Sequence, residues 1–522
     1  MKLLQVKTLD FLSKFAPSTK FSVHGFVKGR SILTNAEAHC DRKPTFVLNL
    51  DLKDFFSTIT FFRVRGVLMA GPFDFSYEVA TVLAHLCTCQ GILPQGACTS
   101  PFLSNLVCRS LDRDLLHLAR RNSCTYTRYA DDITFSFSSR DFKSLPFNIC
   151  IFDGSVVALG DELISLINKH SFEVNDKKTR ISSRYSRQEV TGLTINRFPN
   201  VQRKFVDSVR GALHAWTVYG YKAANKNWIE RVQSSASKPI KERVWRRQTR
   251  KNKLPMLHNL IWGKLLYIRM IRSRHDELYN RLARKYNALL TLEMQQDKDF
   301  KAALLPISHE VHVKDQASQA VYIIEWMGDF VNANGKSEMV GSQGTAFAYR
   351  DNDIIITCEH VFRSELDSGE QVDFCNVTGA TINIRCPSTG FESTATLMHK
   401  DVHRDIAVLK VNDKHKDMRH FVRSDVLASS ETVAILLGFP NWSKGRKMSS
   451  LTTSVLSTYP RSGLPKIEVR DLIRKGNSGG PLVSESFGIL GLAQEGATQS
   501  HGNNECLCVG ELDEWLNSVG VK

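Results

Sequence analysis

The chain has 522 residues, of which 42% are hydrophobic and 23% are charged, and its formal net charge at pH 7 is +16. These are ordinary values for globular proteins, and the length predicts about three domains. No apolar run reaches the roughly 18 residues of a membrane-spanning helix, and the first residues lack a signal-peptide core, so we expect a cytoplasmic protein without a membrane segment.

The positive charge is concentrated in the first 300 residues. They contain 47 Lys and Arg against 26 Asp and Glu, whereas the remaining residues contain 22 and 27. The densest stretch, Arg203 to Lys285, has 21 basic and 5 acidic residues. A large local excess attracts polyanions, and nucleic acid is the first candidate. A solvated basic surface is the alternative, and it accounts less well for so local an excess.

The first 300 residues mix predicted strands and helices. Residues 45–56 predict a buried strand that leads into a turn, and residues 76–88 predict a helix that begins at a serine. Residues 126–138 alternate on both sides of an Asp-Asp pair, which indicates a hairpin. Residues 203–290 have apolar residues at three- and four-residue steps among many Arg and Lys, which predicts basic helices.

The pattern changes in the second part of the chain. Residues 291–319 lose the helical periodicity, and we interpret them as a linker. From Ala320 onward, short apolar runs alternate with turn residues. Short strands at such spacing predict an all-β barrel or sandwich.

Three aspartates would meet if the first strand and the hairpin lay side by side. Asp51 ends the strand, and Asp131 and Asp132 form the hairpin tip. Repulsion makes such a cluster unfavourable without cations, and two Mg²⁺ ions would neutralise it while bridging a nucleoside triphosphate and a primer hydroxyl. An Asp-Asp pair alone is more typical of a solvated turn, so the surrounding residues must decide.

Four motifs around these aspartates resemble the palm motifs of reverse transcriptases, in their order and over about residues 21–290. They are NLDLKDFF (49–56), GILPQGACTSPFLSN (91–105), YADD (129–132) and FEVNDKKTR (172–180). The resemblance implies an RNA-directed DNA polymerase with an α+β right-hand fold of fingers, palm and helical thumb. It also implies that Asp51, Asp131 and Asp132 are the ligands of two Mg²⁺ ions.

The same resemblance implies roles around the nucleotide. Phe56 aligns with the steric gate that selects deoxynucleotides, although a core phenylalanine like Phe55 is the alternative. Gln95 would contact the incoming nucleotide or the template, Lys177 the leaving pyrophosphate, and Arg30 the triphosphate. For Lys177 and Arg30 the alternative is a solvated surface residue.

Two shorter motifs narrow the subfamily. NAEAH (Asn35 to His39) and VTG (Val190, Thr191 and Gly192) resemble the signatures of bacterial retron reverse transcriptases. That resemblance implies copying of a structured non-coding RNA from an internal guanosine 2′-hydroxyl, which gives a branched RNA–DNA product, msDNA. Group II intron and diversity-generating enzymes compete, but no maturase or endonuclease region is evident. Alone, His39 is more typical of a packed histidine.

A second constellation lies in the β-rich part. His360 lies in TCEHVF, Asp405 in HRDIAVLKV and Ser478 in GNSGGP, and the order His, Asp, Ser is that of the chymotrypsin type. The motifs resemble chymotrypsin-fold serine proteases, closest to the HtrA-like bacterial group, over about residues 320–521. The resemblance implies an all-β double barrel and a serine endopeptidase without a cofactor.

Protease roles follow from this resemblance. Ser478 would attack a carbonyl, His360 would move the proton, and Asp405 would orient the imidazole. The N–H groups of Gly476 and Ser478 would form the oxyanion hole. Asn477 departs from the aspartate of digestive trypsin-like enzymes, which implies another route of activation. His403 is the alternative imidazole.

We therefore expect fingers and palm at residues 1–200, a basic helical thumb at 201–290, a linker at 291–319 and a protease domain at 320–522. The expected function is msDNA synthesis on a cognate non-coding RNA, fused to a protease effector in bacterial anti-phage defence with toxin–antitoxin logic. The protein substrate is not identifiable, and the oligomeric state stays open, a homo-oligomer included. The alternatives are a silent protease fold that binds a partner, or a protease that cuts only its own linker.

Overall fold

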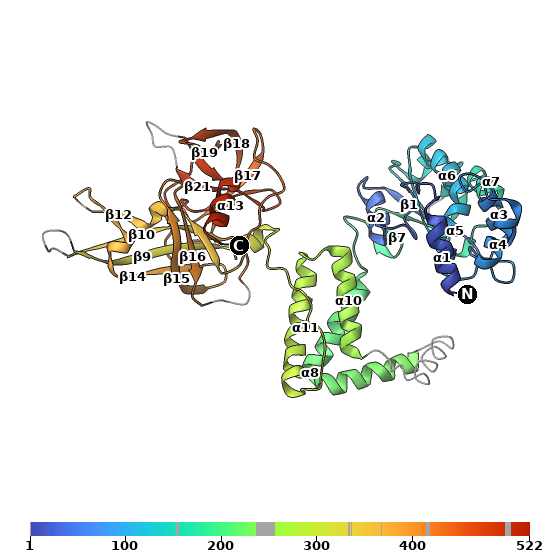
Figure 1. Cartoon of the computed structure of the whole chain (residues 1–522), viewed down its shortest axis with the longest axis horizontal. Coiled ribbons are helices and arrows are strands. Elements are labelled where there is room, and N and C mark those ends of the chain that lie inside the picture. The colour runs from blue at the N-terminus through green and yellow to red at the C-terminus, as the bar shows by residue number, and fades with distance from the viewer. Residues whose placement is uncertain are drawn as a thin grey trace. The chain divides into compact units, whose positions relative to one another are not determined.

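The computed structural model describes residues 2–152, 156–235, 256–331, 335, 337–366, 368–413, 418–495 and 503–521. They form two compact units, Met1–Pro306 and Ile307–Lys522 (Figure 1). None of the helices in these ranges is long and apolar enough to cross a lipid bilayer.

The first unit is built on a four-stranded antiparallel sheet, the palm sheet, with the order β2-β3-β1-β6. Its strands are β1 (Phe46–Asp51), β2 (Thr125–Tyr129), β3 (Asp132–Phe137) and β6 (Arg180–Ser183). Strand β1 is buried along its whole length, as its apolar run predicts, and β2 with β3 forms the predicted hairpin.

Seven helices accompany this sheet. They are α1 (Lys2–Ser13), α2 (Ile32–Cys40), α3 (Phe61–Met69), α4 (Tyr77–Cys87), α5 (Ser100–Val107), α6 (Arg109–Arg121) and α7 (Asp161–Lys169). Helix α4 begins where the sequence predicts it, because the Ser76 hydroxyl accepts a hydrogen bond from the N–H of Val79. Two small hairpins complete this part: β4 (Cys150–Phe152) with β5 (Val157–Leu159), and β7 (Glu189–Val190) with β8 (Leu193–Thr194).

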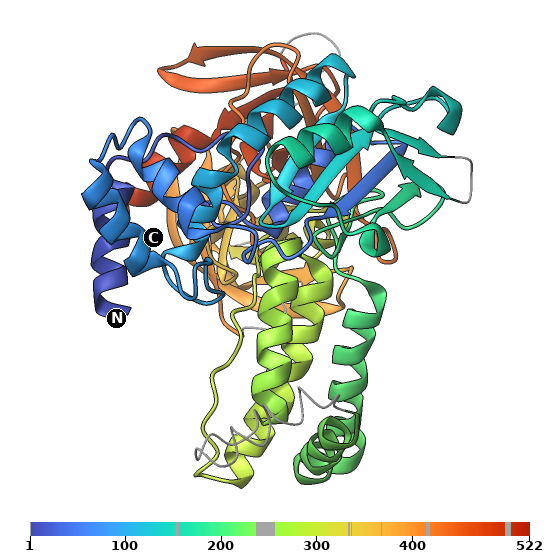
Figure 2. The ribbon, with the colours of Figure 1, turned by 90° about the vertical axis from the view of Figure 1, so that its right-hand side faces the viewer.

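Three longer helices follow in the first unit: α8 (Arg203–Ser235), α10 (Leu257–Arg272) and α11 (Glu277–Gln296). They pack on one another, and Figure 2 shows α10 and α11 running side by side. Helix α8 changes direction at Gly220, whose backbone is not helical and has a positive φ of 75°. Residues 236–255, which the sequence assigns to the same helical region, lie outside the described residues.

The second unit consists of two closed six-stranded antiparallel barrels, so the predicted all-β double barrel is confirmed. The first barrel has the order β10-β11-β16-β15-β14-β9 and the second β17-β18-β19-β22-β21-β20. The strands of the first are β9 (Val321–Val331), β10 (Ser337–Ala348), β11 (Ile354–Thr357), β14 (Thr378–Cys386), β15 (Phe391–Asp401) and β16 (Ile406–Val411). Those of the second are β17 (Val433–Gly438), β18 (Ser449–Arg461), β19 (Leu464–Val469), β20 (Pro481–Ser484), β21 (Ile489–Glu495) and β22 (Glu505–Cys508).

Short elements complete the second unit: the hairpin of β12 (Arg363–Glu365) with β13 (Gln371–Asp373), and the helices α12 (Lys314–Ala317) and α13 (Val509–Ser518). The segment expected to be a linker belongs partly to both units. Helix α11 continues into it as far as Gln296, whereas Val311 is fully buried in the core of the second unit.

Candidate active sites

Two of the predicted carboxylates are neighbours on adjacent strands of the palm sheet. Asp51 is the last residue of β1, Asp132 is the first of β3, and the two are partners in the ladder. Asp131 lies in the turn just before, where Ala130 adopts a left-handed φ of 58°. The carbonyl oxygen of Asp131 accepts a hydrogen bond from the N–H of Leu52 at 3.0 Å. The fold thus places all three aspartates at one end of the palm sheet.

Burial and mutual repulsion act against ionisation of two of these carboxylates. Burial, followed by the charges of Asp131 and Asp51, raises the pKa of Asp132 to about 6. Burial, followed by the charge of Asp51, also raises the pKa of Asp131. Asp51 itself accepts hydrogen bonds from Lys178 Nζ at 2.7 Å and from Asn175 Nδ2 at 3.3 Å.

The donor set fits a pair of hard cations. All three groups offer carboxylate oxygens, which Mg²⁺ prefers. Over the described residues, the three do not form a set in which one oxygen of each lies within 4.8 Å of the others. Ligands of a single Mg²⁺, at about 2.1 Å from the ion, lie no more than about 4.2 Å apart. In two-metal sites the ions lie about 3.5–4 Å apart, and the three carboxylates would be the ligands of such a pair.

A buried ion pair supports the turn that carries Asp131 and Asp132. Arg128 and Asp112 have side chains 0% and 2% exposed, and the guanidinium donates from Nε and Nη2 to the two carboxylate oxygens, both at 2.7 Å. Arg128 Nη1 also donates to the carbonyl oxygen of Ala130 at 3.0 Å. The sequence motifs gave no sign of this support.

The predicted nucleotide-contacting aromatic side chain lies partly at the surface. Phe56 is half-buried and packs edge-on against the buried Phe55, with ring centroids 5.2 Å apart. Phe55 is 4% exposed, so it is the core residue of the pair. Gln95 is exposed in the segment before α5.

The two predicted cations lie in different surroundings. Arg30 donates from Nη1 to the carbonyl oxygens of Lys20 and Val23, so its guanidinium ties the N-terminal segment together. Lys177 is exposed, and its neighbour Lys178 contacts Asp51 instead. Sequence reasoning missed Lys178, although the doubled lysine in NDKKTR was a signal for it.

The two subfamily motifs contact each other. Asn35 in α2 is buried, and its amide donates to the Thr191 hydroxyl at 3.4 Å. Thr191 and Gly192 form the turn between β7 and β8, with φ values of 45° and 82°, and Val190 is fully buried.

His39 belongs to the same helix, α2, and is fully buried. Its ring nitrogens contact the hydroxyls of Ser136 and Thr127, each at 2.7 Å. Burial, followed by the charge of His24, lowers the pKa of His39 to about 3. The imidazole is therefore neutral at physiological pH and fixes α2 to the palm sheet.

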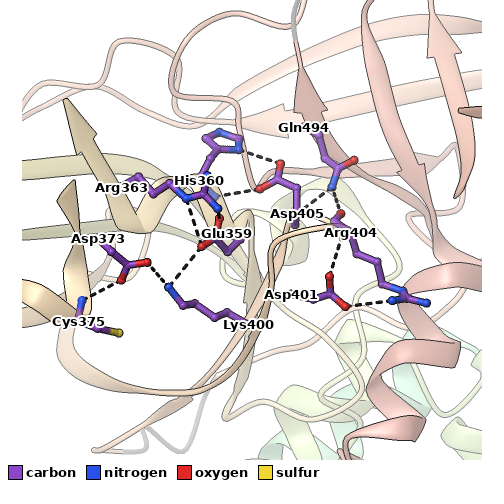
Figure 3. A network of polar contacts seen from close by, with 10 residues as sticks. All are labelled: Glu359, His360, Arg363, Asp373, Cys375, Lys400, Asp401, Arg404, Asp405 and Gln494. Carbon is purple, nitrogen blue, oxygen red and sulfur yellow. Dashed lines mark hydrogen bonds and ion pairs between the residues drawn. The ribbon is translucent and has the colours of Figure 1, made fainter. Parts of the chain in front are cut away.

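The second site lies between the two barrels of the second unit. His360 is in a 3₁₀ turn, Glu359–Phe362, after β11, and Asp405 precedes β16. His360 Nδ1 lies 2.8 Å from Asp405 Oδ2, and the backbone N–H of His360 donates to Asp405 Oδ1 at 2.9 Å (Figure 3). Gln494 Nε2 donates to the carbonyl oxygen of Asp405 at 2.9 Å. The exposed His403 is not needed as the imidazole.

The Ser478 loop is close-packed and passes through left-handed backbone at two glycines. Gly476 and Gly479 have φ values of 94° and 83°. A Cβ at Gly479 would lie 2.1 Å from the carbonyl oxygen of Thr345, so only glycine fits there. Among the hydrogen bonds of the described residues, the N–H groups of Gly476 and Ser478 donate to no protein acceptor. These two amides are thus available to an oxyanion.

Thr345, at the end of β10 that faces this loop, is a residue that sequence reasoning missed. It is fully buried, and its hydroxyl donates to the Gly476 carbonyl oxygen at 2.6 Å while accepting from the N–H of Phe439 at 3.0 Å. Its own N–H donates to the Ser478 carbonyl oxygen at 3.0 Å. No local sequence signal distinguishes such a threonine in a strand.

The Ser478 hydroxyl donates to the carbonyl oxygen of Gln494 at 3.4 Å, and this is its one hydrogen bond among the described residues. His360 and Asp405 are therefore paired, whereas the serine has yet to turn toward the imidazole. Contacts of this kind are often loose in free enzymes and tighten with substrate.

Comparisons with known proteins agree with these two sites. The family model "Reverse transcriptase (RNA-dependent DNA polymerase)" matches residues 1–196, and the model "Trypsin-like peptidase domain" matches residues 344–492. The retron Mx65 reverse transcriptase of Myxococcus xanthus is 41% identical over 232 residues, which cover 41% of this chain and 50% of that protein. The chain thus spans about half the length of this curated relative.

The protease part has relatives of its own. A probable periplasmic DegP-like serine endoprotease of Halomonas elongata is 29% identical over 171 residues, 33% of each chain. The active form of the Rv3671c protease from M. tuberculosis is 17% identical, covers 42% of this chain and 94% of its own, and has a TM-score of 0.31. Residues 1–196 are thus similar to reverse transcriptases, retron enzymes among them, and residues 344–492 are similar to trypsin-like peptidases.

Proposed function

We propose that the first unit is a retron polymerase that copies part of a cognate structured RNA into branched msDNA. The observation that carries the proposal is the meeting of Asp51, Asp131 and Asp132 at one end of the palm sheet. Two Mg²⁺ ions would supply charge neutralisation and activation of the primer hydroxyl there. The three carboxylates would hold these ions, and the raised pKa values of Asp131 and Asp132 reflect burial and mutual repulsion that added positive charge would relieve.

Other residues of the first unit position the nucleotide and the RNA in this proposal. Phe56, whose ring is partly at the surface, excludes a ribose 2′-hydroxyl, while Gln95 and Lys177 contact the nucleotide from exposed positions. Arg30 acts at the triphosphate only if it leaves its carbonyl partners. Because His39 is buried, it supports α2 and does not touch RNA in this proposal. Exposed residues around the NAEAH and VTG motifs make the RNA contacts instead.

The second unit is proposed to be a serine endopeptidase. Ser478 attacks the substrate carbonyl, His360 accepts and returns the proton, and Asp405 holds the imidazole through the 2.8 Å contact at Nδ1. The amides of Gly476 and Ser478 stabilise the oxyanion, and donors of that kind are each worth roughly 3 kcal/mol. The protein that is cut is not identified by the site.

The charge split suggests how the two activities are joined in one bacterial defence system. A basic copying region is tethered to a slightly acidic hydrolase. In this proposal the bound RNA and DNA restrain the protease, and phage infection releases it. Asp131→Asn with Asp132→Asn should abolish msDNA in cells, whereas Ser478→Ala should leave msDNA intact and remove protection against phage. Full protection by the Ser478→Ala strain would rule out the effector role.

A second candidate function is favoured by the hydrogen bond of the Ser478 hydroxyl, which goes to the carbonyl oxygen of Gln494 and not to His360. The second unit would then be a binding module, or a protease that cuts only the chain near residues 291–319. A fluorophosphonate probe that labels Ser478 in no nucleic-acid state would favour the binding module. Intact-mass measurement of the wild type beside Ser478→Ala would reveal self-processing.

A further inference from the structure

A cavity of about 700 Å³ lies in the second unit, beside the loop that connects β17 with β18. Two acidic residues, Asp315 and Glu392, line it together with five basic ones. The basic residues are Lys314, Arg385, Lys444, Arg446 and Lys447. This excess is local, because residues 301–522 contain more acidic than basic residues overall.

An aromatic ring is fixed among these cations. Trp442 is half-buried, and the guanidinium carbon of Arg385 lies 5.4 Å from its ring centroid. The indole N–H donates to the carbonyl oxygen of Arg446 at 3.2 Å. Arg385 is already paired with Glu392 at 2.7 Å, whereas the side chains of Lys444, Arg446 and Lys447 are exposed.

The combination of an ordered aromatic ring with exposed cations is typical of sites for single-stranded nucleic acid. Phosphates pair with the cations, and a base stacks on the ring. A purely acidic chain such as polyglutamate would use the cations but has no ring to stack on the indole. Nucleic acid bound by the first unit, as proposed above, would be tethered to the same chain as this cavity, which raises its effective concentration there.

Two hydrogen bonds, both made by Asn441, connect the cavity to the loop that carries Gly476 and Ser478, which we call the oxyanion loop. Arg446 Nη1 donates to the carbonyl oxygen of Asn441 at 2.9 Å, and the N–H of Asn441 donates to the carbonyl oxygen of Lys475 at 3.1 Å. Lys475 and Gly476 share the peptide bond whose N–H is proposed for the oxyanion hole. A Cβ at Gly476 would lie 2.9 Å from Asn441 N, so the two segments are in contact.

We infer that this cavity binds a single strand of nucleic acid through Lys444, Arg446 and Lys447, with a base on Trp442. A phosphate that takes the Arg446 guanidinium from Asn441 loosens the support of the Lys475–Gly476 peptide. An occupied cavity therefore holds the oxyanion loop in a less ordered state, and release of the strand restores it. The inferred binding site rests on the contacts described above, whereas its role in switching a protease rests on the proposed function.

The test is photo-cross-linking of the full chain with a short single-stranded DNA that carries a photoreactive thymine analogue, with the cross-linked peptides located by mass spectrometry. RNA of the same sequence is a second arm. Cross-links should reach residues 442–448 with at least one strand. Because about three phosphate contacts give a salt slope near −2, the affinity should fall about 20-fold between about 50 and 200 mM salt.

Lys444→Gln with Lys447→Gln removes two cations without touching the Arg446–Asn441 bond, and its salt response should shrink to about threefold. Lys410→Gln, an exposed lysine of β16 outside the cavity, is the matched control and should behave as wild type. In hydrogen exchange, strand binding should accelerate exchange at Asn441 in the wild type, but not in the double variant at the same strand concentration.

Three outcomes would overturn the inference: no cross-link to residues 442–448, equal cross-linking in the double variant, or polyglutamate binding there as tightly as DNA. An unchanged Asn441 exchange rate with the strand in place would overturn the coupling. Specific cross-links together with a Ser478 that never reacts with a fluorophosphonate would support this site and remove the proposed protease activity, so the two failures are distinguishable.

Discussion

The hydroxyl of Thr345 should order the oxyanion loop, and Thr345→Val tests this with little change in side-chain shape. The substitution leaves the Phe439 N–H and the Gly476 carbonyl oxygen without their partner inside the protein. A buried polar group left unpaired costs about 1–3 kcal/mol, so the pair should cost about 2–6 kcal/mol. Since each 1.4 kcal/mol is about a factor of ten, the Phe439 amide should exchange at least tenfold faster.

Hydrogen exchange of the full-length chain, followed by peptide mass spectrometry, measures this directly. Thr345→Ser is the control, because it keeps the hydroxyl and loses only a methyl group. It should leave exchange at Phe439 close to that of the wild type. Ser478 labelling should fall in the valine variant and persist in the serine variant. Wild-type exchange at Phe439 in Thr345→Val would refute the bridging role.

Three further predictions concern the first unit. Lys178→Ala removes the ammonium that competes with Mg²⁺ for Asp51, so the Mg²⁺ concentration for half-maximal DNA synthesis should fall. Lys177→Ala is the control and should not lower it. Equal Mg²⁺ concentrations in the two variants would contradict this. Because burial lowers the pKa of His39 to about 3, the unfolded chain binds a proton that the folded chain does not as the pH falls below 6.5. The free energy of unfolding should therefore drop by about 1.6 kcal/mol from pH 6.5 to 5 because of His39, and urea titrations of His39→Gln should lack this contribution. Asp112→Asn leaves the buried Arg128 without its counter-charge and should lower the free energy of unfolding by about 3–5 kcal/mol, and a change below 1 kcal/mol would exclude that cost.

Local patterns were sufficient for much of the fold. The apolar run that became β1 and the alternation around Asp131 and Asp132 predicted the strand and the hairpin correctly, because burial acts on neighbouring residues. Barrel closure is different, since β9 pairs with both β10 and β14. Such non-local pairing leaves no periodicity, so the pattern alone allowed a barrel or a sandwich.

The same distinction between local and non-local features applies to the residues of the candidate sites. Residues inside compact motifs, such as His360 and Asp405, could be named from the sequence and lie in contact. Thr345 could not, because its partner Gly476 is 131 residues away and a threonine in a strand is unremarkable locally. Lys178 was missed because the register of a single 3₁₀ turn decides which of two adjacent lysines reaches Asp51.

The most direct test of the account is a protease assay on the full-length chain purified with its bound nucleic acid, before and after nuclease treatment. Peptide hydrolysis should be low in the intact complex, should rise after nuclease, and should be absent in Ser478→Ala in both states. Hydrolysis that never appears, or that persists unchanged in Ser478→Ala, would contradict the proposal that nucleic acid bound to the first unit restrains a serine protease in the second.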